Sequence, residues 1–353
     1  MQQGTHARRA IVVLLLAIGL LTLHARAQDA APPKTGDVDA ETPAAIADEL
    51  MTGFYESYPD DTLERWHAAL LEVREAEPNE PLWEAALIAV ELRNGDSGAA
   101  KARAKSARER FKRSADVAYW YGEAQFRTLG RGTGVMDAMG AVDRALPAYR
   151  DAIKLDPGHV PARVGLSMYH LNAPWIAGGR KGKAKKLAGE MLALEGGEPW
   201  GRFILFQWAM SESKKQLDQH YRAAIEVCGE DQRRAMAFQY ALHLIEDDPD
   251  DDRIPGLLSD IESASAAPDT MALYARARWH FAAERFAPAV DVLGQVLELD
   301  DAARNSRYML AEALEKLKRR GQAAEQYRLF AEKFPEDDRA GKARKKAKRL
   351  SRG

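Results

Sequence analysis

Residues 304–337 read RNSRYMLAEALEKLKRRGQAAEQYRLFAEKFPED, and residues 270–303 share their length and their arrangement of small and large apolar positions. Four apolar positions correspond at an offset of 34: Ala277 with Ala311, Ala289 with Ala323, Leu293 with Tyr327, and Val296 with Phe330. A period of about 34 residues is typical of helical hairpins that stack into a solenoid. The sequence therefore predicts an all-α fold with regular repeats at 270–303 and 304–337.

A third stretch carries the pattern expected of the second helix in such a hairpin. Ala145, Tyr149, Ala152 and Pro157 follow one another at spacings of 4, 3 and 5, and a proline can end the pattern because it cannot continue a helix. These residues and the 34-residue period resemble the tetratricopeptide-repeat family over residues 82–337. The resemblance implies a right-handed α-solenoid of about five to seven helical hairpins. Residues 81–269 are expected to form degenerate or insertion-bearing repeats.

Helical periodicity also predicts individual helix pairs, and no run of residues has the alternation of a strand. The expected pairs are 82–94 with 98–112, 199–210 with 213–227, and 232–245 with 254–264.

The N-terminus has the three parts of a secretory signal peptide. Arg8 and Arg9 precede an apolar run at 10–23, and the sequence Ala-Arg-Ala at 25–27 supplies small residues before a cleavage site. The run is shorter than the ~20 apolar residues that a membrane span needs. We therefore expect residues 1–27 to be removed on export.

The remaining chain divides into a flexible leader at 28–42, rich in Ala, Pro and Asp, and a solenoid at 43–353. Its one cysteine, Cys228, cannot close an intrachain disulfide. Export without disulfides favours a bacterial envelope. The chain thus resembles an exported bacterial tetratricopeptide-repeat protein, soluble in the periplasm.

Charge and motifs exclude several functional classes. Lys and Arg number 51 and Asp and Glu 53, and loss of the three arginines in 1–27 changes the net charge from −2 to −5. This balance does not favour nucleic acid as a partner. No H-E-x-x-H, G-x-S-x-G or paired-cysteine motif occurs, and the acidic run at 247–252 lacks the spacing of a calcium loop. We expect no catalytic residue, cofactor or metal ligand.

The resemblance implies a binding surface, because the first helix of each tetratricopeptide hairpin lines the concave face. The residues expected to point into this groove are Tyr274, Arg278, Phe281, Asn305, Tyr308, Glu312 and Lys316. Tyrosine together with Arg, Asn and Lys is suited to holding an extended peptide or helix. The alternative is that half of these residues pack against the neighbouring hairpins.

Two glycine-rich loops interrupt the period in consecutive hairpins, at 130–134 (GRGTG) and 174–183 (PWIAGGRKGK). Stacking should place them side by side at one edge. Their backbone amides, cations and aromatic ring are suited to an anion or an acidic segment. The residues concerned are Arg131, Trp175, Arg180, Lys181 and Lys183. The alternative is a long loop in which glycine serves only the turns.

Residues 338–353 carry many Lys and Arg and are expected to form a basic cap helix. The alternative is weak contact with an anionic membrane or cell-wall polymer. For the whole chain, we expect a non-enzymatic scaffold or adaptor that binds an envelope protein or peptide in the concave groove. The alternative function is binding of a small anionic ligand or glycan fragment at 130–134 and 174–183, in the service of a transporter or a cell-wall system.

Overall fold

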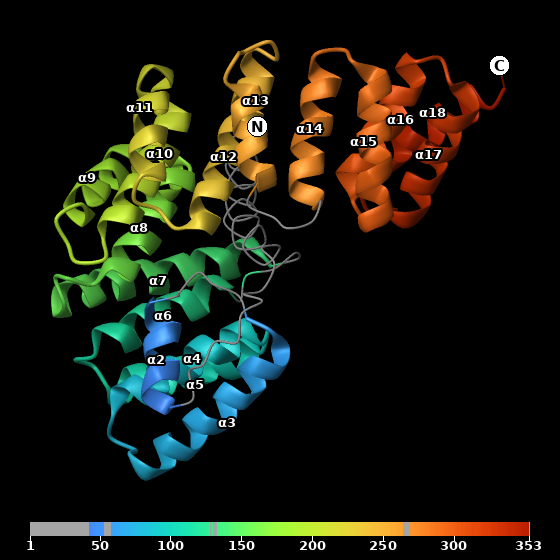
Figure 1. Cartoon of the computed structure of the whole chain (residues 1–353). Helices are drawn as coiled ribbons and strands as arrows, with labels where there is room; N and C mark the ends of the chain where they lie inside the picture. Colours follow the sequence, from blue (N-terminus) through green and yellow to red (C-terminus); the bar gives the residue numbers. More distant parts are fainter. Residues whose placement is uncertain (1–41, 53–57, 128, 130–132, 264–268, 353) are drawn as a thin grey trace, which may run out of the picture. The chain divides into compact units, whose positions relative to one another are not determined.

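The computed structural model describes residues 42–52, 58–127, 129, 133–263 and 269–352, and all regular elements in these ranges are helices. The all-α solenoid predicted from the repeat period is confirmed (Figure 1). The expected signal peptide at 1–27 and all but the last residue of the leader at 28–42 lie outside the described residues. The helices form two compact units, one up to Gln216 and one from Leu217.

The first unit stacks its hairpins in chain order (Figure 1). Each first helix packs on the second helix of its own hairpin and on the first helix of the next hairpin. The pairs are α2 (Pro43–Thr52) with α3 (Asp60–Ala76), α4 (Pro81–Arg93) with α5 (Ser97–Arg110), α6 (Ala115–Arg127) with α7 (Val135–Leu155), and α8 (Val160–Asn172) with α9 (Lys181–Met191), followed by α10 (Glu198–Glu212).

The second unit begins within α11 (Lys214–Ile225) and continues with three hairpins and a final helix. These are α12 (Glu230–Asp247) with α13 (Ile254–Ser263), α14 (Thr270–Ala282) with α15 (Phe286–Leu299), α16 (Arg304–Lys316) with α17 (Arg320–Lys333), and α18 (Ala340–Leu350). The helix pairs expected from periodicity agree with these bounds to within two residues wherever the ends are described.

The 34-residue offset appears in the packing as well as in the sequence. All eight corresponding positions of the two regular repeats are buried, and Tyr327 and Phe330 are the larger counterparts of Leu293 and Val296. The turns repeat too, because Glu284 and Lys318 have φ angles of 57° and 60° at equivalent places. The second helix of each repeat therefore presents its core residues in the same register.

Close approach between hairpins in the first unit depends on two glycines around one tyrosine. A Cβ atom on Gly122 of α6 would lie 2.7 Å from Cε1 of Tyr149, and one on Gly165 of α8 would lie 3.0 Å from Cζ of the same ring. The Tyr149 hydroxyl donates a hydrogen bond to Oε1 of Glu123 at 2.6 Å. The ring of α7 is thus enclosed by helices from two consecutive hairpins.

Both insertions lengthen the connection between the helices of a hairpin by the same amount. Gly122 to Ala145 and Gly165 to Ala188 each span 23 positions, whereas the corresponding Ala277 to Ala289 spans 12. In the first insertion α7 begins ten residues before Ala145. In the second, a 3-10 turn, η1 (Trp175–Ala177), precedes α9.

We expect Gly122→Ala to lower the free energy of unfolding of the first unit by about 1–3 kcal/mol, because the added methyl group overpacks against Tyr149 and the Ala145 carbonyl. Gly189→Ala in α9 is the control, since a Cβ atom there meets nothing within 4 Å. The control should raise stability by up to about 1 kcal/mol. Urea unfolding measures both, and equal effects of the two changes would contradict the packing described here.

We also expect Lys318→Gly to raise the free energy of unfolding by about 0.5–1 kcal/mol, because a side chain in the left-handed region is strained and glycine removes most of that strain. Gln295→Gly, at an exposed position inside α15, should instead lower it by about 1 kcal/mol. The same unfolding experiment compares the two variants. A loss of stability in both would show that the Lys318 backbone carries no strain.

Candidate functional site

The seven residues expected in a concave groove lie on α14 and α16, but they are not equally accessible. Tyr308 is only 6% exposed, and its ring packs edge-on against Tyr327 and Phe330 of α17, with centroids 5.6 Å and 5.0 Å away. Tyr308 therefore does not point into an open groove, and it follows the alternative of packing against neighbouring helices. Its position in the repeat faces the next layer of the stack, which α18 completes.

Neighbouring elements also engage several of the other residues. Tyr274 is half-buried and faces Phe238 of α12 at 6.5 Å, and Phe281 meets the ring of Phe286 at 5.5 Å. Lys316 is exposed, with its ammonium group 5.9 Å from the Phe286 centroid. The aromatic members of this set therefore contribute to packing while keeping part of their surface accessible, except for Tyr308.

Two of the charged members, Arg278 and Glu312, form ion pairs between successive layers. Arg278 Nη2 lies 2.9 Å from Glu246 Oε1 of α12, with both side chains accessible to solvent. Glu312, 34 positions after Arg278, lies 3.6 Å from the Lys346 ammonium of α18. The same repeat position thus pairs with the preceding first helix, α12, in one repeat and with the final helix, α18, in the next.

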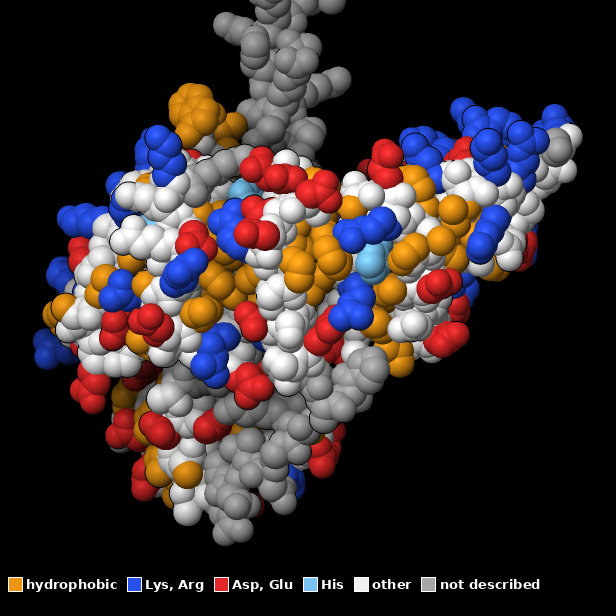
Figure 2. Space-filling model, turned by 45° about the horizontal axis from the view of Figure 1, so that its top comes forward, with side chains coloured by type: hydrophobic (Ala, Val, Ile, Leu, Met, Phe, Trp, Pro, Cys, Tyr) orange, Lys and Arg blue, Asp and Glu red, His pale blue; other side chains and the backbone are white. Residues whose placement is uncertain are grey.

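Helix α18 occupies the place that the first helix of another repeat would take. Arg339, just before it, donates to Asn305 Oδ1 at 2.9 Å and lies over the Tyr308 ring at 4.9 Å. Asp337 accepts hydrogen bonds from the Arg339 guanidinium and, with a smaller effect, from its backbone N–H, and these lower the pKa of the Asp337 carboxyl to about 2. The tail is therefore docked as a cap on the last repeat, and its remaining Lys and Arg side chains gather at the C-terminal end of the surface (Figure 2).

At the glycine-rich edge, two of the cations expected to bind an anion already have partners, one in the turn before α9 and one in α10. Arg180 donates to the carbonyl oxygens of Trp175 and Gly179 at 2.8 Å and 2.7 Å, and Lys181 pairs with Glu212 at 2.7 Å. Lys183 is exposed, and Trp175 is 76% exposed. Arg131 lies outside the described residues.

Two glycines and one hydrogen bond shape the same turn. Gly178 has a φ of +88°, and a Cβ atom on Gly179 would lie 1.8 Å from the Ala173 carbonyl oxygen. The Tyr169 hydroxyl donates to the Ala177 carbonyl, while the Tyr169 ring stacks on Phe126 of α6 at 6.2 Å. Through Tyr169, these contacts connect the second insertion to the C-terminal end of α6, the helix just before the first insertion.

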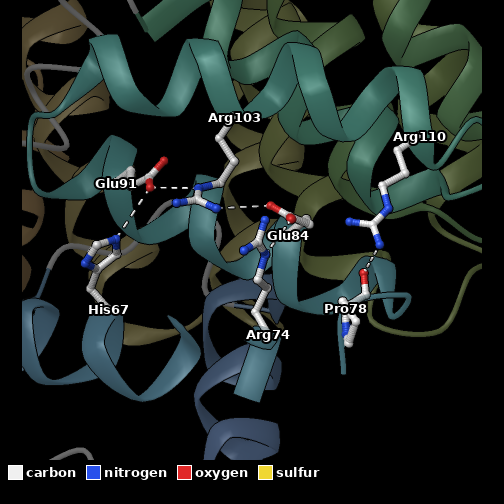
Figure 3. Close-up of polar contacts among 7 residues, drawn as sticks. All are labelled: His67, Arg74, Pro78, Glu84, Glu91, Arg103 and Arg110. Carbon is white, nitrogen blue, oxygen red and sulfur yellow. Dashed lines mark hydrogen bonds and ion pairs between the residues drawn. The ribbon is translucent and has the colours of Figure 1, made fainter. Parts of the chain in front are cut away.

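A buried ionic network joins α3, α4 and α5, as Figure 3 shows. Arg103 of α5 reaches two buried carboxylates of α4, with Nε 2.8 Å from Glu91 Oε1 and Nη1 3.2 Å from Glu84 Oε2. Arg74 of α3 adds a second contact to Glu84 at 2.9 Å, and His67 lies 3.4 Å from Glu91. Nearby, Arg110 donates to the Pro78 carbonyl in the turn between α3 and α4.

Sequence reasoning missed this network, although one signal for it was present. Glu84 and Glu91 are seven residues apart in a helix whose other residues are mostly apolar, so both project from one buried face. Carboxylates on such a face need cations from neighbouring helices. Arg103 and Arg74 supply the cations, and Glu91 Oε2 is left buried with no hydrogen-bond partner among the described residues.

Among the described residues, no group of His, Cys, Asp and Glu has the arrangement of a metal site. Burial, with a smaller contribution from nearby Lys183, lowers the pKa of His170, which favours the neutral ring at neutral pH. Burial raises the pKa of the Cys228 thiol to about 11, so the reactive thiolate is disfavoured. None of the described helices is both long enough and apolar enough to cross a membrane.

Comparison with known proteins agrees with this geometry. Residues 86–159, from α4 to the start of α8, match the family described as tetratricopeptide repeat. Over these residues the chain is similar to tetratricopeptide repeats. The match covers the Gly122–Tyr149 contact, so that contact lies between helices of the repeat. No curated protein matches the chain in sequence.

Solved structures share the tetratricopeptide-like fold at low identity. The Cut9–Hcn1 hetero-tetramer of the APC/C is 13% identical, with a TM-score of 0.56 over 91% of this chain and 58% of that chain. Yeast Tom70 is 14% identical, with a TM-score of 0.58 over 91% and 67%. The human IFIT1 dimer with m7Gppp-AAAA is 14% identical, with a TM-score of 0.53 over 88% and 72%. The chain thus spans just over half the length of the Cut9–Hcn1 chain, and these similarities show the fold alone.

We expect Arg103→Met to lower the free energy of unfolding of the first unit by about 3–5 kcal/mol, because it leaves two buried carboxylates without their shared cation. The combined variant Arg103→Met, Glu84→Gln and Glu91→Gln should recover part of this loss, since it removes the buried negative charges as well. Chemical denaturation at neutral pH compares them. A triple variant no more stable than the single variant would show that charge pairing is not what the network supplies.

Proposed function

We propose that this chain is a non-enzymatic scaffold of the bacterial cell envelope, which holds a protein or peptide partner along the first helices of its C-terminal repeats. The tetratricopeptide-like fold supports an interaction scaffold, and proteins of this kind are generally non-catalytic. The envelope setting rests on residues 1–27, whose sequence has the form of a signal peptide.

The observation that carries the proposal is the contact between α12 and α14. Where these first helices meet, Arg278 and Glu246 form an accessible ion pair, and the half-buried ring of Tyr274 faces Phe238. Adjacent helices therefore present charge and aromatic surface together. A peptide chain laid across them gains both apolar contact and charge-assisted hydrogen bonds.

Tyr274 and Arg278 are the contact residues in this proposal, with Phe281 and Lys316 further along the same repeats. Tyr308 acts indirectly, because its ring helps to seat α18 against the last repeat. Asn305 and Glu312 are bound by Arg339 and Lys346, so they come into contact with a partner only at the margin of α18. The proposed surface is thus centred on α14.

The proposal predicts a specific cross-link in intact cells. A cross-linker that passes the outer membrane but not the inner membrane should join the wild-type chain to an envelope protein, which mass spectrometry identifies. Tyr274→Ala with Arg278→Ala should reduce the yield at least about tenfold, as expected when interface residues worth more than 1.4 kcal/mol are lost.

Arg328→Ala is the matched control, because Arg328 is an exposed arginine in ion pairs with Glu325 and Glu332 on the second helix of its hairpin. It should leave the cross-link unchanged. Cross-linking only with a reagent that crosses the inner membrane would contradict the envelope setting. An equal yield from the wild type and the α14 variant would contradict the binding surface.

A further inference from the structure

Large exposed apolar side chains are concentrated where the repeat is interrupted. Seven such residues occur among those described, and four of them, Met136, Met139, Trp175 and Ile176, follow the two glycine-rich stretches or lie within them. Because the insertions occupy the same place in consecutive hairpins, they share one edge of the stack. The repeat core does not need these side chains, and their exposure is unfavourable in water alone.

Trp175 and Ile176 form the apex of the second insertion, with exposed fractions of 76% and 46%. The turn that carries them is held by hydrogen bonds, from Arg180 to the Trp175 and Gly179 carbonyls and from the Tyr169 hydroxyl to the Ala177 carbonyl. The two apolar side chains are therefore held outward by the backbone without collapsing onto the fold.

The residues that follow the apex are strongly basic. From 175 to 186 the chain has five Lys and Arg residues and no Asp or Glu. Three of the cations are engaged elsewhere: Arg180 with the backbone of its own turn, Lys181 with Glu212, and Lys185 over the Trp208 ring at 3.7 Å. Lys183 is exposed, and Lys186 is 80% exposed although its ammonium group lies 3.9 Å from Glu190 Oε1. Two accessible cations thus lie within eleven residues of an apolar apex.

We propose that this edge docks the protein onto the surface of an anionic lipid bilayer. Tryptophan prefers the interface between headgroups and acyl chains, because its ring is apolar and its indole N–H is polar. Flanking lysines are attracted to anionic headgroups, and their apolar stems extend along the interface. A protruding apex inserts one or two apolar side chains directly into a bilayer. This mode of binding needs no groove on the protein.

Both candidate partners are anionic, so it is the shape of the turn that favours a lipid surface over an acidic protein segment. The apolar side chains project from a convex turn, so a protein partner needs its own pocket to bury them, whereas a bilayer offers apolar depth everywhere along its surface. This proposal is independent of the partner surface on α14, which belongs to the other unit.

Co-sedimentation with phosphatidylcholine vesicles, with and without phosphatidylglycerol, tests the proposal. The chain is purified as residues 28–353, since the apolar run at 10–23 would bind vesicles by itself. The wild type should sediment with the anionic vesicles at least about tenfold more strongly than with the neutral ones. Trp175→Ala with Ile176→Ala should lose at least about tenfold in affinity for anionic vesicles.

Charge-reversal variants separate this edge from the basic tail. Lys183→Glu with Lys186→Glu should also weaken binding, whereas Lys345→Glu with Lys348→Glu on α18 makes the same change in net charge and should not. Leu299→Ala removes an apolar side chain that is 56% exposed in the other unit and should leave binding unchanged. Circular dichroism confirms that each variant remains folded.

Insertion depth gives a second readout. Brominated lipids should quench part of the tryptophan fluorescence of the wild type, and Trp175→Phe should lose that quenching while still sedimenting with the vesicles. Absence of wild-type binding to anionic vesicles would overturn the proposal, as would full binding by the Trp175→Ala, Ile176→Ala variant. Loss of binding only on charge reversal in α18 would assign the membrane contact to the tail.

Discussion

The Tyr149 ring packs between Gly122 and Gly165, and this contact illustrates the constraint on which the architecture depends: each hairpin must pack against the next one. A two-helix hairpin cannot bury both of its apolar faces, so each hairpin needs the next one. Stacking brings a large side chain of one layer against a position in the next that has little or no side chain. The regular repeats achieve this with Ala277 and Ala311, both fully buried, and α18 closes the series because the last repeat still has an apolar face to cover.

The repeat period was enough to predict the helices and their core positions, because apolar spacing along one helix is a local property. Neighbours in the stack are not local. The sequence identified a basic cap at 338–353, yet only the structure shows that the cap buries Tyr308 and binds Asn305 through Arg339. The same reason explains why the role of Arg180 was not predicted. The sequence indicated a cation available to bind an anion, whereas in the structure the guanidinium is bound to the backbone carbonyls of its own turn.

The buried network of the first unit and the Arg278–Glu246 pair of the second have different physical roles. Glu84, Glu91 and Arg103 lie inside the helix stack, where ion pairing mainly offsets the cost of burying charge and adds little net stability. Their geometry instead fixes how α3, α4 and α5 are aligned, since a shifted helix would leave a carboxylate unpaired. The Arg278–Glu246 pair is open to solvent, where such pairs contribute little to folding. Its groups can therefore exchange partners at little cost.

The insertions lie outside the contacts that the stacking of hairpins requires. Eleven extra positions between Gly165 and Ala188 leave both ends of the hairpin in register, so the fold places no demand on the apolar character of the inserted residues. A loop free of that demand ordinarily has a polar surface. Here it is a turn that exposes Trp175, and hydrogen bonds from Tyr169 and Arg180 hold its backbone away from the core. The exposure of this ring is unfavourable in water, and the proposed docking onto a bilayer would relieve it.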